Sequence, residues 1–138
     1  MPVLRVTTPT PLSDATTASL AAALTHLTAE RLGKRAEVTV VYFESKSPST
    51  WFINAAPATL PTALLEIDIT EGTNLTQEKA AFIASAHTLL REQLGATENT
   101  TAEQYADASY VVIRENAATD WGYGGVTQAK RRELAARL

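Results

Sequence analysis

The chain has 138 residues, of which 45% are hydrophobic and 20% charged, and this length and composition predict one globular domain over residues 1–138. A net charge of −3 gives no reason to expect nucleic acid or a membrane as a partner. No apolar run is long enough for a signal peptide or a membrane span, so a cytoplasmic location is expected. The absence of cysteine excludes disulfides and thiolate chemistry, and the two histidines, His26 and His87, lack the spacing of zinc ligands.

The first half of the chain predicts a strand, a long helix and a second strand. Residues 2–8 form a strand that ends in a proline-containing turn. Ser13 is the expected N-cap of a helix over residues 15–32, where leucines recur at helical spacing, and Gly33 ends this helix. The β-branched and aromatic run 37–43 then predicts a strand. Because a long helix separates the two strands, we expect them to pair in parallel.

The second half repeats this order. Residues 63–69 alternate as a strand. Asn74 with Gln77 resembles a capping box, and it opens a helix that continues to about Leu94. Residues 109–113 predict the last strand, because three of the five are β-branched.

The two halves, residues 1–61 and 62–138, are therefore predicted to be βαβ repeats of one domain. The second repeat carries an extra polar segment at 97–107. The expected fold class is α+β in the order β-α-β-β-α-β, with a four-stranded mixed sheet and two helices on one face. Such a sheet leaves its second face bare, and association with further copies would cover it.

Pro2 is the first candidate for chemistry. A small residue after the initiator normally permits removal of Met1, which would leave the proline nitrogen as a secondary amine able to act as base, acid or nucleophile. The ordinary α-amino pKa is about 8, and burial or a nearby cation would bring it towards neutrality, where proton transfer is most effective. The alternative is that Pro2 only stiffens an edge strand.

Several segments occur in the order of a known family. The second half contains Ile-Asp-Ile-Thr-Glu-Gly at 67–72, Val-Val-Ile-Arg-Glu at 111–115 and Trp-Gly-Tyr-Gly-Gly at 121–125. Together with the Met-Pro start and the tandem repeat, these segments resemble the tautomerase superfamily, which includes 4-oxalocrotonate tautomerase and macrophage migration inhibitory factor. The resemblance implies a homotrimer with three active sites near the N-terminal prolines. It also implies keto–enol proton transfer on a small 2-oxo acid, such as an arylpyruvate, with no cofactor and no metal.

The resemblance assigns roles to individual positions. Pro2 matches the catalytic proline, and Lys34 matches a lysine near it that could bind a substrate carboxylate. Tyr110 matches an active-site tyrosine that is usually supplied by a neighbouring subunit. Asp120 and Trp121 resemble the acidic-aromatic pair of malonate semialdehyde decarboxylase and the cis-chloroacrylate dehalogenases, in which the acidic residue activates a water.

The family's arginines are missing from their usual places, where Thr73 and Tyr110 stand in the second repeat. Arg114 is the best replacement, because it shares a strand face with Tyr110 and a guanidinium can bind a carboxylate through two hydrogen bonds. The basic run 130–132 is predicted to be a solvated helical tail. Three aromatic residues are candidates for the wall of an apolar substrate pocket: Trp51, Trp121 and Tyr123.

Two alternatives remain open beside the tautomerase. One is hydration, dehalogenation or decarboxylation of a small acrylate or semialdehyde in the same fold, in which Asp120 gains importance. The other is a non-catalytic ferredoxin-like binding module, because that fold has the same order of elements.

Overall fold

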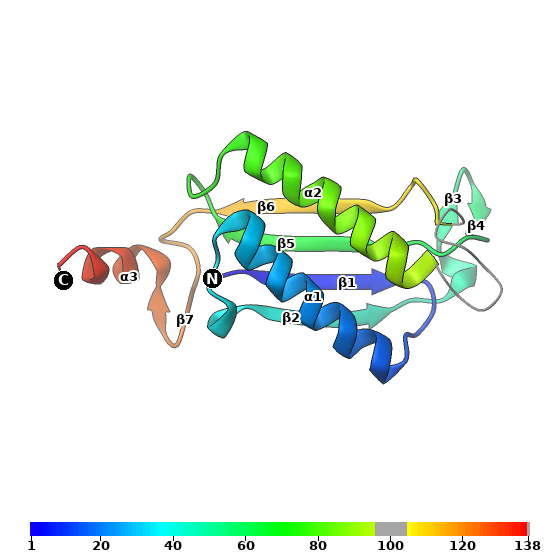
Figure 1. Cartoon of the computed structure of the whole chain (residues 1–138), viewed down its shortest axis with the longest axis horizontal. Helices are drawn as coiled ribbons and strands as arrows, with labels where there is room; N and C mark the ends of the chain where they lie inside the picture. Colours follow the sequence, from blue (N-terminus) through cyan, green and yellow to red (C-terminus); the bar gives the residue numbers. More distant parts are fainter. Residues whose placement is uncertain (96–104, 138) are drawn as a thin grey trace.

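In the computed structural model, four strands form one mixed sheet in the order β2-β1-β5-β6 (Figure 1). β1 (Val3–Thr8) is parallel to β2 (Val40–Ser45), and β5 (Leu64–Thr70) is parallel to β6 (Tyr110–Asn116). β1 and β5 join the two pairs in antiparallel orientation. The predicted α+β class and the parallel pairing of each strand couple are confirmed.

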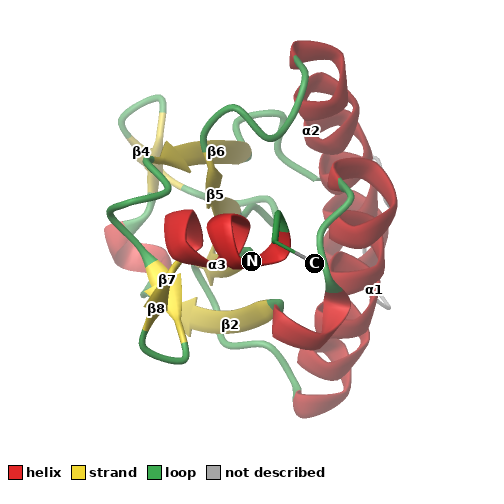
Figure 2. Cartoon of the chain, turned by 90° about the vertical axis from the view of Figure 1, so that its left-hand side faces the viewer, coloured by secondary structure: helices red, strands yellow, loops and turns green. Residues whose placement is uncertain are grey.

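Two helices, α1 (Asp14–Leu32) and α2 (Thr76–Leu90), cover the same face of this sheet (Figure 2). Ser13 caps α1 as predicted, since its hydroxyl oxygen accepts a hydrogen bond from the backbone nitrogen of Thr16 at 3.1 Å. Gly33 ends α1 with φ of 67°, a left-handed conformation that glycine adopts at little cost.

Shorter elements connect the main ones. They are the 3-10 helices η1 (Ala36–Val38) and η2 (Pro48–Thr50), the π-helical turn η3 (Arg91–Gly95), the hairpin of β3 (Phe52–Ile53) and β4 (Ala56–Pro57), the hairpin of β7 (Gly122–Tyr123) and β8 (Val126–Thr127), and α3 (Gln128–Ala135). The β3–β4 hairpin lies beyond one end of the sheet, and α3 lies beyond the other, where the chain starts (Figure 1).

The structure describes residues 1–95 and 105–137. Most of the extra polar segment predicted at 97–107 therefore lies outside the described residues. Within the described ranges, no helix is long and apolar enough to cross a membrane.

Two local predictions were wrong. Residues 36–38 form η1 instead of the start of a strand, because Thr39 donates hydrogen bonds back to the carbonyls of Arg35 and Ala36, and β2 begins only at Val40. Asn74 does not cap α2, because its amide donates to the last carbonyl of α1, that of Leu32, at 3.0 Å. Glu78, one position after the predicted Gln77, accepts the hydrogen bond from the backbone nitrogen of Leu75, which is the N-cap.

The hydrophobic core lies between the sheet and the two helices. Alternate residues of the central strands face the helices, so they are fully buried while their neighbours point to the opposite face. The largest fully buried side chains are those of Leu4, Val6, Leu20, Leu24, Leu65, Ile67, Ile69, Phe82 and Leu90.

Among the described residues, no helix of the length of α1 or α2 covers the opposite, open face of the sheet (Figure 2). Val40, Tyr42 and Tyr110 are exposed on it. A polar band also crosses it, in which the carboxylate of Glu66 contacts the guanidinium groups of Arg114 and, at 3.8 Å, Arg5. The open face thus combines apolar side chains with an ion-pair cluster, as an association surface would.

Candidate active site

Pro2 opens β1 at the end of the sheet where β5 and β6 finish. The register pairs Val3 with Asp68 and with Val40, and Asp68 in turn pairs with Arg114. The Pro2 side chain is fully buried, and its carbonyl accepts a hydrogen bond from the backbone nitrogen of Val40 at 3.1 Å. Pro2 is therefore held in one position at this end of the sheet, which we call the Pro2 end.

The amino group that precedes Pro2 lies in a positive environment. Burial is the main cause that lowers the pKa of the Met1 α-amino group, and the charges of Lys34 and Arg35 lower it further. Arg35 forms an exposed ion pair with Glu37 at 3.6 Å. An amine at this place consequently loses its proton more readily than it would in water.

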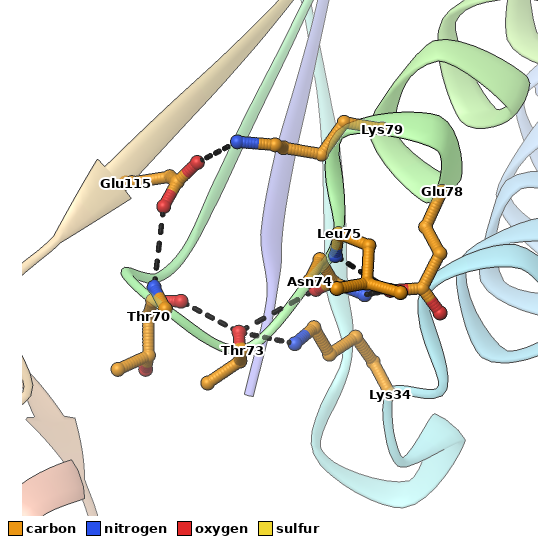
Figure 3. Close-up of polar contacts among 9 residues, drawn as sticks. Lys34, Thr70, Thr73, Asn74, Leu75, Glu78, Lys79 and Glu115 are labelled. Atoms are coloured by element: carbon orange, nitrogen blue, oxygen red, sulfur yellow. Dashed lines mark hydrogen bonds and ion pairs between the residues drawn. The ribbon is translucent and has the colours of Figure 1, made fainter.

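Lys34 reaches across from the end of α1 to the turn after β5. Its ammonium donates a hydrogen bond to the hydroxyl of Thr73 at 2.9 Å, and that hydroxyl donates to the carbonyl of Thr70 at 2.6 Å (Figure 3). Burial lowers the pKa of Lys34, and Arg132 adds to this effect, whereas Glu78 opposes it. No carboxylate of the described residues forms an ion pair with Lys34, so its charge remains available to an anion.

A second lysine nearby is neutralised. The ammonium of Lys79 binds the carboxylate of Glu115, which also accepts a hydrogen bond from the backbone nitrogen of Gly72 at 3.3 Å (Figure 3). The hydrogen bond from Lys79 lowers the pKa of Glu115. Glu115 thus serves to hold the turn at Gly72, where φ is 74°, and so positions Thr73.

Asp120 and Trp121 occupy the connection between β6 and the C-terminal hairpin. The indole nitrogen of Trp121 donates to the hydroxyl of Thr70 at 3.0 Å, which brings the ring to the Pro2 end. Asp120 is exposed, and its carboxylate accepts a hydrogen bond from the hydroxyl of Thr119 at 2.8 Å. Among the described residues, nothing joins the Asp120 carboxylate to Pro2 or Lys34.

No protein-family model matches the sequence, and no curated protein matches it significantly. Solved structures match almost the whole chain. One titled R7 fused 4-OT, an asymmetric trimer, is 26% identical, with 96% of this chain and 98% of that chain covered and a TM-score of 0.70. N1, a member of the cis-3-chloroacrylic acid dehalogenase family, is 17% identical, with 99% and 92% covered and a TM-score of 0.78. Macrophage migration inhibitory factor of Toxoplasma gondii is 16% identical, with 91% and 98% covered and a TM-score of 0.69.

The chain has the fold of the tautomerase superfamily. The resemblance expected from the sequence is thereby confirmed. The two βαβ units of this chain, β1-α1-β2 and β5-α2-β6, account for the whole four-stranded sheet of the tautomerase fold.

Within one chain of this tautomerase fold, the candidate residues divide between the two ends of the sheet. Tyr110 starts β6 and aligns with Leu64 and Thr7, at the end opposite to Pro2, where it is 67% exposed. Trp51 lies at that same end, directly before the β3–β4 hairpin (Figure 1). Lys34 and Trp121 lie at the Pro2 end.

Two predicted substrate-binding residues have partners inside the chain. Arg114 does share a strand face with Tyr110, but its guanidinium binds Glu66 on the open face. The Tyr123 ring lies 3.7 Å from the guanidinium carbon of Arg131, measured to the ring centroid, in a cation–π contact. Arg131 also donates to the Tyr123 carbonyl at 2.9 Å, so Tyr123 belongs to the packing of the C-terminal segment.

A cleft lies away from the Pro2 end. It has a volume of about 520 Å³ and is lined by the turn after β1 together with residues 58–62 and the end of η3, including Pro9, Leu12, Leu60 and Leu94. None of the described residues that line it is charged. In the part of the chain that the structure describes, no three histidine or acidic side chains converge as metal ligands.

The sequence had given no role to Thr73, Lys79 and Glu115, although they build the Pro2 end. The one local signal for them is Gly72, which marks the tight turn that Glu115 holds and that precedes Thr73. Their partners stand 36 to 43 residues away along the chain, so no spacing pattern could have joined them.

Proposed function

We propose that the protein is a cofactor-independent enzyme of the tautomerase superfamily that transfers a proton between carbon and oxygen of a small 2-oxo acid. The observation that carries this proposal is the environment of the chain start, where burial and the charges of Lys34 and Arg35 lower the pKa of an amine. Once Met1 is removed, the secondary amine of Pro2 would meet the same buried, cationic surroundings. An amine whose pKa lies near the working pH is the group that general acid–base catalysis needs.

The reaction proposed is a balanced rearrangement. In the enol-to-keto direction the ammonium form of Pro2 donates its proton to C3, while the hydroxyl on C2 gives its proton to a solvent water and becomes the carbonyl. The neutral amine then takes up a proton from the hydronium so formed, which restores the catalyst. Lys34 binds the carboxylate of the substrate as a point charge, and a tyrosine hydroxyl, that of Tyr110, donates a hydrogen bond to the oxygen on C2.

This assignment of roles requires more than one copy of the chain, because Tyr110 and Pro2 lie at opposite ends of the sheet. We propose a homotrimer in which the Tyr110 end of one copy meets the Pro2 end of the next. The exposed apolar side chains on the open face of the sheet support this assembly, as does the trimeric assembly named for the fused 4-OT structure. Trp51 would then join the site from the neighbouring copy.

The decisive experiment follows the conversion of phenylenolpyruvate to its keto form by Met1-processed protein, whose mass is verified first. Pro2→Ala should lower kcat/KM by about 10² to 10⁴, the usual contribution of a positioned acid–base group. Pro11→Ala, in the exposed turn after β1, is the matched control and should leave the rate unchanged. Equal rates for wild type and Pro2→Ala would end the proposal. Retention of Met1 in the natural protein would favour a non-catalytic binding module.

A second candidate is hydration or dehalogenation of a small acrylate. It is favoured by one observation: Asp120 is exposed directly beside Trp121, whose indole is fixed at the Pro2 end. In this reaction the Asp120 carboxylate would activate a water. Release of chloride from 3-chloroacrylate, abolished in Asp120→Asn but not in Asp107→Asn, would support it, and the absence of chloride release would exclude that activity.

A further inference from the structure

The C-terminal helix α3 brings one more cation to the Pro2 end. Both views of the molecule place α3 beyond the end of the sheet where the chain starts (Figures 1 and 2). The backbone nitrogen of Gln128 donates to the carbonyl of Trp121 at 3.0 Å, and that of Ala129 donates to Ala118 at 2.8 Å. Because the Trp121 indole is in turn bound to Thr70, α3 is tied to the same end of β5 that carries Thr73.

The basic side chains of this segment are not equivalent. Arg131 packs on the Tyr123 ring, and Lys130 and Arg137 each bind Glu133, at 3.3 and 2.7 Å. Arg132 is exposed, and within the described residues its guanidinium has neither a hydrogen bond nor an ion pair. Among the described lysines and arginines of residues 130–137, it is therefore the one without a hydrogen bond or an ion pair.

Arg132 is close enough to Lys34 for their charges to interact. The interaction contributes to the lowered pKa of Lys34, whose own ammonium contacts only the neutral hydroxyl of Thr73. Two like charges that share no anion repel one another, and a bound carboxylate would relieve this repulsion. The sequence-based expectation of a solvated tail gave Arg132 no such role.

We propose that Arg132 and Lys34 together bind the carboxylate of the substrate, so that α3 contributes a substrate-binding residue in place of the arginines missing at Thr73 and Tyr110. The inference rests on the proposed function for the identity of the substrate but on the described contacts for the place of the cations. A guanidinium can donate hydrogen bonds to both carboxylate oxygens, while the ammonium of Lys34 adds a point charge. The site therefore selects acids over their esters or amides.

The test compares Arg132→Gln and Arg132→Lys with Arg137→Gln in full-length, Met1-processed protein. Arg137 is the matched control, because it is an arginine of the same segment that is neutralised by Glu133. Two readouts are used: KM and kcat for phenylenolpyruvate, and calorimetric binding of benzoate, an unreactive carboxylate, beside uncharged benzyl alcohol. Arg132→Gln should raise KM and weaken benzoate binding by about 10- to 100-fold, the loss of a charged hydrogen bond, with little change in kcat or in benzyl alcohol binding.

Arg132→Lys should recover part of the loss, and Arg137→Gln should stay within about twofold of wild type. Wild-type benzoate affinity in Arg132→Gln, or no benzoate binding by the wild type, would overturn the inference. A wild type without any tautomerase activity whose benzoate binding depends on Arg132 would refute the proposed function and leave the carboxylate site standing. Activity that depends on Pro2 but not on Arg132 would support the proposed function and refute the carboxylate site at Arg132.

Discussion

The two ends of the sheet differ in what each could contribute to a reaction. Within the residues that the structure describes, the Pro2 end holds a buried chain start and two cations without carboxylate partners, Lys34 and Arg132, but the cleft of about 520 Å³ is not there. The Tyr110 end holds that cleft and exposed aromatic side chains, and none of the described residues that line the cleft is charged. Under the proposed function, each end supplies part of a site that is completed when copies of the chain associate.

The largest expected effect tests this division directly. Pro2→Ala should lower kcat/KM by about 10² to 10⁴ and Tyr110→Phe by about 10² to 10³, because each removes one half of the proposed acid–base and oxyanion-binding pair. If the halves come from different copies, a refolded equimolar mixture of the two variants should regain about a quarter of wild-type activity, since random assembly places both intact residues together at that frequency. A mixture no more active than its components would show that Pro2 and Tyr110 do not act across an interface.

A smaller effect is expected at Lys34. Lys34→Met removes a cation that holds down the pKa of the amine, so the basic limb of the pH–rate profile, where the proton-donating ammonium form is lost, should move to higher pH. KM should also rise by about tenfold or more through the lost contact with the substrate carboxylate. Lys46→Met makes the same change of charge at the opposite end of β2, and its profile should overlay that of the wild type. A shift of the profile to lower pH in Lys34→Met would contradict the account.

The smallest effect concerns Arg114, which lies towards the Pro2 end yet is engaged by Glu66 on the open face. Arg114→Gln should lower the free energy of unfolding by about 1 kcal/mol, a value reduced because the arginine is half exposed. Its kcat/KM at constant trimer content should change little. Chemical denaturation measures the free energy of unfolding. Arg137→Gln, which breaks an exposed ion pair, is the control and should leave this free energy unchanged. A large loss of kcat/KM in Arg114→Gln without loss of stability would show instead that Arg114 binds the substrate, as the sequence predicted.

Local signals in the sequence were sufficient for the fold. Ser13 with Gly33 identified both ends of α1, and the leucines at helical spacing identified the helix between them. These features depend on residues a few positions apart, which is the range over which periodicity and capping act.

The candidate site was less predictable, because its contacts join distant segments. Lys34 and Thr73 are 39 residues apart, and Lys79 and Glu115 are 36 apart, so their pairing exists only in the folded chain. The alternation of residues along β6 placed Arg114 on the correct face of the sheet, but it could not predict the ion pair of Arg114 with Glu66 on the neighbouring strand. Asn74 illustrates the same limit, since one amide could cap its own helix or satisfy the end of α1, and only the packing of α1 beside α2 decides between them.

The most direct test of the central claim is an NMR titration of the Pro2 nitrogen in Met1-processed protein, repeated on the urea-unfolded chain. The account predicts a pKa that is lower in the folded protein than in the unfolded chain and that rises when Lys34 is changed to Met. A folded-state pKa equal to or above the unfolded one would contradict it, because Pro2 would then have no advantage over an ordinary chain start.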